Sequence, residues 1–131
     1  MKTGVELSIN GTTQTIASAA ELSARLSATA NAAHRDIWLY APNGAALCAL
    51  MNGNRGWLMF LRESGDPGFS SRNPNYVGSR DETIEYVLSN GEANTHPAEW
   101  ALTEFEIARA LRHFVEHKTL PPFIHWHDDS I

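Results

Sequence analysis

Residues 37–61 read IWLYAPNGAALCALMNGNRGWLMFL, and this stretch decides the fold. Three apolar runs occupy residues 37–40, 45–51 and 56–61, and two short segments rich in Asn and Gly separate them. Asn and Gly favour tight turns because they adopt the required backbone angles at little cost. Apolar runs joined by short turns predict a three-stranded antiparallel meander. One face of such a sheet needs an apolar cover, which we expect helices to provide.

Further strands are predicted on both sides of the meander. The runs 5–9 and 12–16 enclose Asn10-Gly11, a pair that favours the positive φ angles of a two-residue hairpin turn. These two runs therefore predict a hairpin at the start of the chain. Three later segments also have strand-like patterns: residues 83–88, 100–102 and 123–126.

Two capping boxes mark the starts of helices. In a capping box, a Ser or Thr and a Glu three residues later satisfy amide groups that the first helical turn leaves free. Ser18-Ala19-Ala20-Glu21 predicts a helix over residues 18–31, and Thr103-Glu104-Phe105-Glu106 predicts a second helix that ends near His117. Together the elements predict a single α+β domain over residues 1–131. We expect a mostly antiparallel sheet of about six or seven strands with two main helices packed against it.

Composition limits the classes of function. The 131 residues include 15 acidic and 10 basic side chains, for a net charge of −5. Nucleic-acid-binding proteins present a basic surface, so we expect no nucleic-acid partner. No apolar run follows Met1, which predicts neither a signal peptide nor a membrane-spanning segment, and hence no membrane partner. Cys48 is the single cysteine and cannot form an internal disulfide, so a cytoplasmic location is the expectation.

A histidine-rich segment gives the strongest metal-site signal. His113-Phe114-Val115-Glu116-His117 matches the H-x-x-E-H pattern of inverzincin metalloproteases, and its two histidines would share one helix face. His125 and His127 follow nearby. A catalytic zinc site needs a third protein ligand, and only 14 residues follow His117. We therefore expect no metal and an ordinary helix end, and keep a metal-binding protein or enzyme built on these histidines as an alternative.

No other catalytic signature is complete in the sequence. The chain has no G-x-S-x-G, no G-x-G-x-x-G and no P-loop. A single cysteine cannot supply the P-C-x-x-C half of the zinc-deaminase signature. We therefore predict a protein without catalytic residues or cofactors, whose function is to bind another protein.

Residues 64–81 are rich in Gly, Pro, Ser and Asn and offer little to bury. This composition predicts a long loop, and loops of this length in a compact domain are usually functional or disordered. Carboxylates and tyrosines lie within it and on the strand that follows. Such residues suit docking onto a basic protein surface, with the aromatic side chains as anchors. The candidate contact residues are Asp66, Tyr76, Asp81, Glu82, Glu85 and Tyr86.

Five segments in the second half of the chain carry a family resemblance: Gly65-Asp66-Pro67, Thr83-Ile84-Glu85-Tyr86-Val87-Leu88, His96-Pro97-Ala98-Glu99, Ile107-Ala108-Arg109-Ala110-Leu111-Arg112-His113-Phe114, and Leu120-Pro121 before Trp126. In this order, over residues 58–127, they resemble immunity protein family one, the small cytoplasmic antidotes of bacterial polymorphic toxins. One departure is His117-Lys118-Thr119, where the family often has a glycine just after the helix.

The resemblance implies that the chain neutralises a cognate toxin, commonly a nucleic-acid deaminase in this family. Such an enzyme needs a basic, concave site for its substrate, and an acidic protein can occlude that site. The expected partner is therefore a basic, nucleic-acid-modifying toxin. An interaction domain of the same fold without a toxin partner is the remaining alternative.

Overall fold

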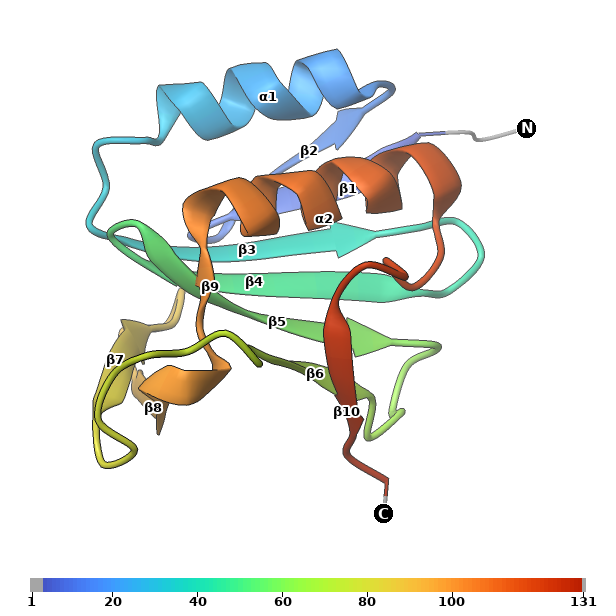
Figure 1. The fold of residues 1–131 in the computed structure, drawn as a ribbon. Coiled ribbons are helices and arrows are strands. Elements are labelled where there is room, and N and C mark those ends of the chain that lie inside the picture. Colours follow the sequence, from blue (N-terminus) through green and yellow to red (C-terminus); the bar gives the residue numbers. More distant parts are fainter. Residues whose placement is uncertain (1–3, 131) are drawn as a thin grey trace.

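The computed structural model describes residues 4–130, so residues 1–3 and 131 of the predicted domain lie outside the described part of the chain. The fold is α+β with two α-helices and a mostly antiparallel sheet, as predicted, but with more strands than six or seven (Figure 1). In chain order the elements are β1 (Val5–Ile9), β2 (Thr12–Ile16), α1 (Ala19–Ala28), β3 (His34–Tyr40), β4 (Ala46–Asn52), β5 (Arg55–Leu61), β6 (Phe69–Arg72), β7 (Thr83–Val87), β8 (Ala93–Pro97), the 3₁₀ helix η1 (Ala98–Trp100), β9 (Leu102–Thr103), α2 (Glu104–His117) and β10 (His125–Asp128).

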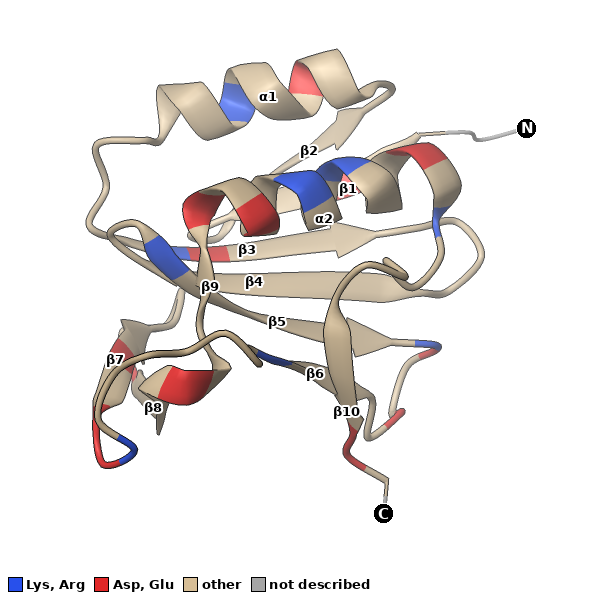
Figure 2. Ribbon diagram, in the orientation of Figure 1, with Lys and Arg blue, Asp and Glu red and all other residues tan. Residues whose placement is uncertain are grey.

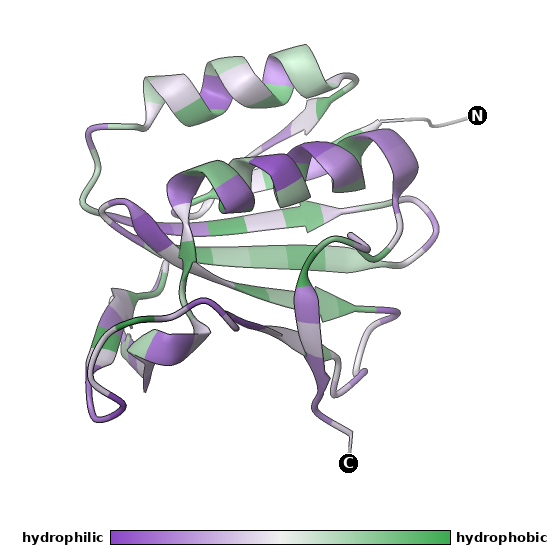
Figure 3. Ribbon diagram, in the orientation of Figure 1, coloured by the Kyte–Doolittle hydropathy of each residue, from purple (hydrophilic) through white to green (hydrophobic). Residues whose placement is uncertain are grey.

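The main sheet has the order β10-β6-β5-β4-β3-β1-β2, with the short β9 paired to β5. The predicted meander β3-β4-β5 forms its centre, and Figure 3 shows β4 and β5 as largely hydrophobic. The predicted hairpin β1-β2 pairs with β3 at one edge. Its turn residues have positive φ, 50° at Asn10 and 89° at Gly11, which is why Asn-Gly suits this turn.

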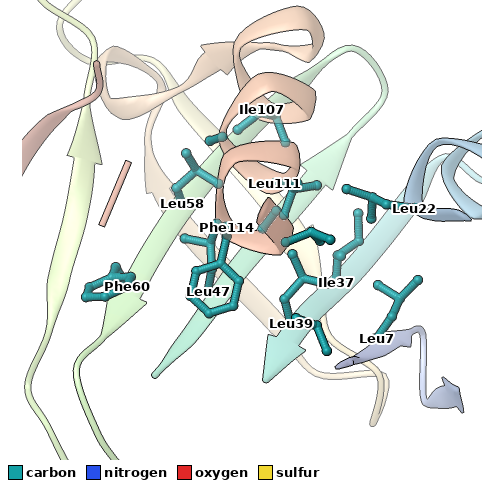
Figure 4. Close-up of a cluster of buried hydrophobic side chains, with 14 of the residues drawn as sticks. Leu7, Leu22, Ile37, Leu39, Leu47, Leu58, Phe60, Ile107, Leu111 and Phe114 are labelled. Carbon is teal, nitrogen blue, oxygen red and sulfur yellow. The ribbon is translucent and has the colours of Figure 1, made fainter. Parts of the chain in front are cut away.

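Both helices cover one face of the main sheet (Figure 1). Alternate residues of the central strands point to this face and meet the apolar stripe of α2, as Figure 4 shows for Leu58, Leu47 and Phe114. Helix α2 has the predicted capping box. Helix α1 ends at Ala28, earlier than the predicted residue 31, because the Thr29 hydroxyl and amide bond to the last carbonyls of the helix.

The opposite face of the main sheet is partly covered by a second, two-stranded sheet, β7-β8. Ile84 and Tyr86 of β7 join a second apolar cluster with Leu50 and other residues of the main sheet. The Asp36 carboxylate accepts hydrogen bonds from the Ser89 amide and hydroxyl, at 2.8 and 2.9 Å, and so fixes the end of β7 against β3. The hairpin therefore has a defined position on the sheet.

Several predicted boundaries were wrong, and the largest error concerns residues 64–81. This segment contains β6, which pairs with β5 and β10, so it is not one long loop. Strand β8 was not predicted at all. The short strand expected at 100–102 is η1 followed by β9, and the closing strand lies at His125–Asp128. All these strands are short and polar, so pairing with neighbours rather than apolar pattern determines them.

Candidate functional site

The six predicted contact residues do not form one cluster. Asp66 lies in the turn between β5 and β6, where its carboxylate accepts hydrogen bonds from the Arg62 side chain at 2.8 and 2.9 Å and from the Arg62 amide at 2.8 Å. These bonds hold the pKa of Asp66 well below its ordinary value, and only 4% of the side chain is exposed. Asp66 therefore closes a turn and is not a freely presented carboxylate.

Tyr86 was predicted as an aromatic contact residue, but its side chain is buried against the main sheet. Only 1% of the residue is exposed, and burial raises the pKa of Tyr86 to about 12. The cause is the two-residue period of β7: Ile84 and Tyr86 face the main sheet, while Thr83 and Glu85 face solvent. Glu85 is therefore presented on the outer surface of the hairpin, beside Thr95 of β8.

Tyr76 and Glu82 are joined at the base of the loop formed by residues 73–82. The Tyr76 hydroxyl lies 2.7 Å from Glu82 Oε1 and 2.8 Å from the Ser79 carbonyl oxygen. Arg55 of β5 reaches the other Glu82 oxygen with two nitrogens, each at 3.3 Å. The hydrogen bond from Tyr76, together with Arg55, lowers the pKa of Glu82, and the same bond raises the pKa of Tyr76. These contacts fix the two ends of the loop to the sheet.

One end of the molecule is strongly acidic. Residues 73–106, which we call the acidic end, hold seven of the fifteen acidic residues and one of the ten basic residues of the chain. Loop 73–82, the β7-β8 hairpin, η1 and the start of α2 bring these carboxylates to the same side of the fold (Figure 2). The acidic residues are Asp81, Glu82, Glu85, Glu92, Glu99, Glu104 and Glu106.

Some of this negative charge is neutralised by neighbouring arginines. Arg55 pairs with Glu82 at 3.3 Å, and Arg80 pairs with Glu99 at 3.2 Å. Four exposed carboxylates of the acidic end have no ion-pair partner within residues 4–130. They are those of Asp81, Glu85, Glu92 and Glu104.

Two apolar side chains project from the acidic end. Val77, at the tip of the loop, is 98% exposed, and Phe105, in the first turn of α2, is 74% exposed. Phe105 also lines a groove of about 410 Å³ together with Tyr76 and Leu102. Sequence reasoning missed Phe105, although the helical period places it on the side of α2 opposite the apolar stripe. Phe105 and Val77 therefore add exposed apolar surface to the acidic end.

The histidine motif and the cysteine offer no assembled reaction centre. His113 and His117 share a helix face, as predicted, with ring centroids 4.6 Å apart. Burial, with a smaller effect of His117, lowers the pKa of His113. Across residues 4–130, no group of three or more His, Cys, Asp or Glu side chains is arranged to hold a metal ion. Burial raises the pKa of the Cys48 thiol, which disfavours a thiolate nucleophile.

No helix in the described part of the chain has both the length and the apolar character needed to span a membrane.

Comparison with known proteins identifies the family. The chain has no significant match among curated proteins. The family model described as immunity protein Imm1 matches residues 10–128, which include every described strand except β1, both helices and the acidic end. The chain belongs to the immunity protein Imm1 family.

Proposed function

We propose that this protein is a non-catalytic, cytoplasmic inhibitor that binds a cognate bacterial toxin through its acidic end, with residues 1–131 acting as one domain. Membership of an immunity protein family supports the general role of protection against a toxin. In this proposal the acidic end is the surface that contacts the toxin. The partner we propose is a basic, nucleic-acid-modifying enzyme of the deaminase class, whose substrate site is occluded by the bound inhibitor.

The observation that carries this proposal is the uneven distribution of charge. Residues 73–106 hold seven acidic residues and one arginine, and Arg55 and Arg72 reach this segment from β5 and β6, whereas the rest of the chain holds eight acidic and nine basic residues. An enzyme that acts on nucleic acid presents a basic groove to its substrate. A surface of opposite charge speeds encounter with such a groove and fixes the orientation of the complex. The four carboxylates without ion-pair partners are free to meet lysines and arginines of the toxin.

Apolar contacts would supply much of the affinity. Hot-spot residues of interfaces are commonly large side chains that become fully buried in the complex. Phe105 meets this description because it is large, 74% exposed in the free protein and surrounded by charged residues, and Val77, which is 98% exposed, would add a smaller apolar contact. A standard interface buries about 800 Å² on each partner, so loop 73–82, the hairpin and the start of α2 would all take part.

A matched pair of charge-reversal variants tests the proposal. The partner is the toxin encoded beside this protein's gene, purified in an inactivated form. Asp81→Lys with Glu85→Lys changes two unpaired carboxylates of the acidic end, whereas Glu63→Lys with Glu116→Lys makes the same change in net charge elsewhere on the surface. We expect the first variant to weaken toxin binding by about 100-fold and the second by less than about threefold, as measured by calorimetry.

The dependence on salt sharpens the test. Binding through opposite charges weakens as ionic strength rises, because salt screens exposed charges. The protein and the Glu63→Lys, Glu116→Lys variant should therefore lose affinity between 50 and 300 mM NaCl, roughly in parallel. Equal affinities for the two charge-reversal variants, or the absence of any complex with the neighbouring toxin, would contradict the proposal. Circular dichroism and thermal unfolding establish that both variants are folded.

A further inference from the structure

A groove lies between the two helices, on the face of the main sheet that they cover. Its volume is about 250 Å³. It is lined by Ile37 and Met51 of the sheet, by Leu26 of α1, and by Ile107 and Leu111 of α2. The walls and floor of this groove are therefore largely apolar.

A buried arginine without a partner lies in this groove. Arg35 of β3 is 5% exposed and lines the groove, yet its Nε is buried and makes no hydrogen bond within the described residues. No carboxylate of residues 4–130 lies within ion-pair distance of it. A buried charge without a partner is strongly destabilising, and native proteins normally pair such groups.

Four arginines that are more exposed than Arg35 do have a partner. Arg55 and Arg62 each bond to a carboxylate, and Arg72 lies 3.7 Å above the Trp100 ring while donating to the Ser71 carbonyl. Arg109 lies 3.8 Å above the Phe123 ring. Arg35 is thus the buried arginine to which the described structure gives no matching group, and it points to an anion supplied from outside the chain.

We propose that the groove binds a small monocarboxylate with an apolar body, and that Arg35 holds its carboxylate. A guanidinium pairs with a carboxylate through two parallel hydrogen bonds, which a single bound water does not reproduce. Ser23 and Ser27 lie one helical turn apart on α1 and line the same groove, so their hydroxyls can complete the head-group site. The apolar walls receive the hydrocarbon part.

Size and charge narrow the class of ligand. Sites for drug-sized ligands measure about 300–1,000 Å³, so a groove of about 250 Å³ suits a short or medium-length acid. Glu104 also lines the groove, at the exposed start of α2. Its negative charge repels phosphates and other multiply charged anions more strongly than a singly charged one, so a single carboxylate is the head group that we propose for Arg35.

Three probes of equal chain length test this proposal on the full chain: octanoate, 1-octanol and octylammonium. We expect octanoate to bind at least tenfold more tightly than 1-octanol by calorimetry, and octylammonium to bind most weakly. Arg35→Met keeps a long apolar side chain but removes the charge, so it should abolish the preference for octanoate over 1-octanol. Arg80→Met, a change at an exposed arginine outside the groove, should leave all three affinities unchanged.

Two further measurements distinguish loss of the ligand site from loss of the fold. Arg35→Met removes an unpaired buried charge, so its Tm should equal or exceed that of the unmodified protein. Ala108→Leu fills the groove from α2 without altering Arg35, and should weaken octanoate at least tenfold while the fold is retained. Equal binding of octanoate and 1-octanol, tighter binding of octylammonium, or unchanged octanoate affinity in Ala108→Leu would each overturn the proposal.

Discussion

Residues 62–72 and residues 73–82 are both polar and rich in small residues, yet the fold uses them in opposite ways. The first segment closes on itself through Arg62 and Asp66 and then pairs on both sides as β6. The second is held by Asn73, by the Tyr76–Glu82 contact and by the Arg80–Glu99 ion pair, and projects Val77 into solvent. One segment builds the sheet and the other presents the surface that we propose binds the toxin.

The comparison shows that a polar composition does not by itself predict a loop. Ser71 is fully buried in β6, where its hydroxyl accepts a hydrogen bond from the Leu58 amide and donates one to the Trp100 carbonyl. Gly68, with φ +82°, lies so close to β5 that a Cβ would be 2.6 Å from the Phe60 carbonyl oxygen. Ser71 is required for its hydroxyl and Gly68 for close backbone approach at positive φ, and a hydropathy pattern expresses neither requirement.

The largest effect is expected for Ser71→Val. Valine fits a strand but cannot bond to the Leu58 amide or the Trp100 carbonyl, so two buried polar groups lose their partner. We expect the free energy of unfolding to fall by about 3 kcal/mol in urea titrations. Ser64→Val, at an exposed position of the same segment, is the control and should change it by less than about 0.5 kcal/mol. A small loss at Ser71 would show that β6 does not depend on this serine.

Val77→Ala should weaken toxin binding without changing stability, the reverse of Ser71→Val. Since its side chain is 98% exposed, shortening it removes no contact in the free protein and the unfolding midpoint should not move. If Val77 is buried by the toxin, binding should weaken by about tenfold, which corresponds to about 1.4 kcal/mol of lost burial. Lower stability of Val77→Ala, or an unchanged dissociation constant for the toxin, would contradict the assignment of residues 73–82 to binding rather than to stability.

Much of the fold could be predicted because its central elements carry strong local patterns. The meander, the Asn10-Gly11 hairpin and both capped helices combine apolar periodicity with specific turn or cap residues. Strands β6, β8 and β9 could not be predicted in the same way. They are two to five residues long and polar, and pairing partners distant in the sequence determine them.

The candidate site was less predictable than the fold. Tyr76, Asp81, Glu82 and Glu85 do lie in the acidic end, but Tyr86 is buried, since a strand period alternates its faces. Asp66, which the composition predicts at the start of a long loop, lies instead in the short turn between β5 and β6, outside the acidic end. The contributions of Glu92, Glu99 and Glu104 required the three-dimensional arrangement, because these residues come from separate elements that only the tertiary structure brings together.

Asp66→Asn tests whether the charge of Asp66, in the turn of residues 62–72, contributes to stability. The neutral amide cannot pair with Arg62 as a carboxylate does, so we expect the Tm at pH 7 to fall by about 3 °C. Because the pKa of Asp66 is lowered in the folded protein, its stabilising effect is complete above the ordinary value of 3.8 and is lost as pH falls below it. The difference in Tm between the two proteins should therefore shrink from pH 5 towards pH 2. A constant difference over that range would exclude the charge of Asp66 as its cause.

The smallest effect is expected for Tyr76→Phe, which removes one hydroxyl and keeps the ring in its groove. The loop would lose its bond to Glu82 but remain attached through Asn73, whose side-chain amide donates to the Ala101 carbonyl at 2.9 Å. Amide hydrogen exchange of residues 77–81 should accelerate, and toxin affinity should fall by about threefold because binding must then order the loop. Tyr40→Phe, at an exposed tyrosine of β3, should change neither quantity. Faster exchange without weaker binding would mean that loop 73–82 need not be ordered before the toxin binds. The carboxylates of the hairpin, rather than the loop, would then determine the affinity.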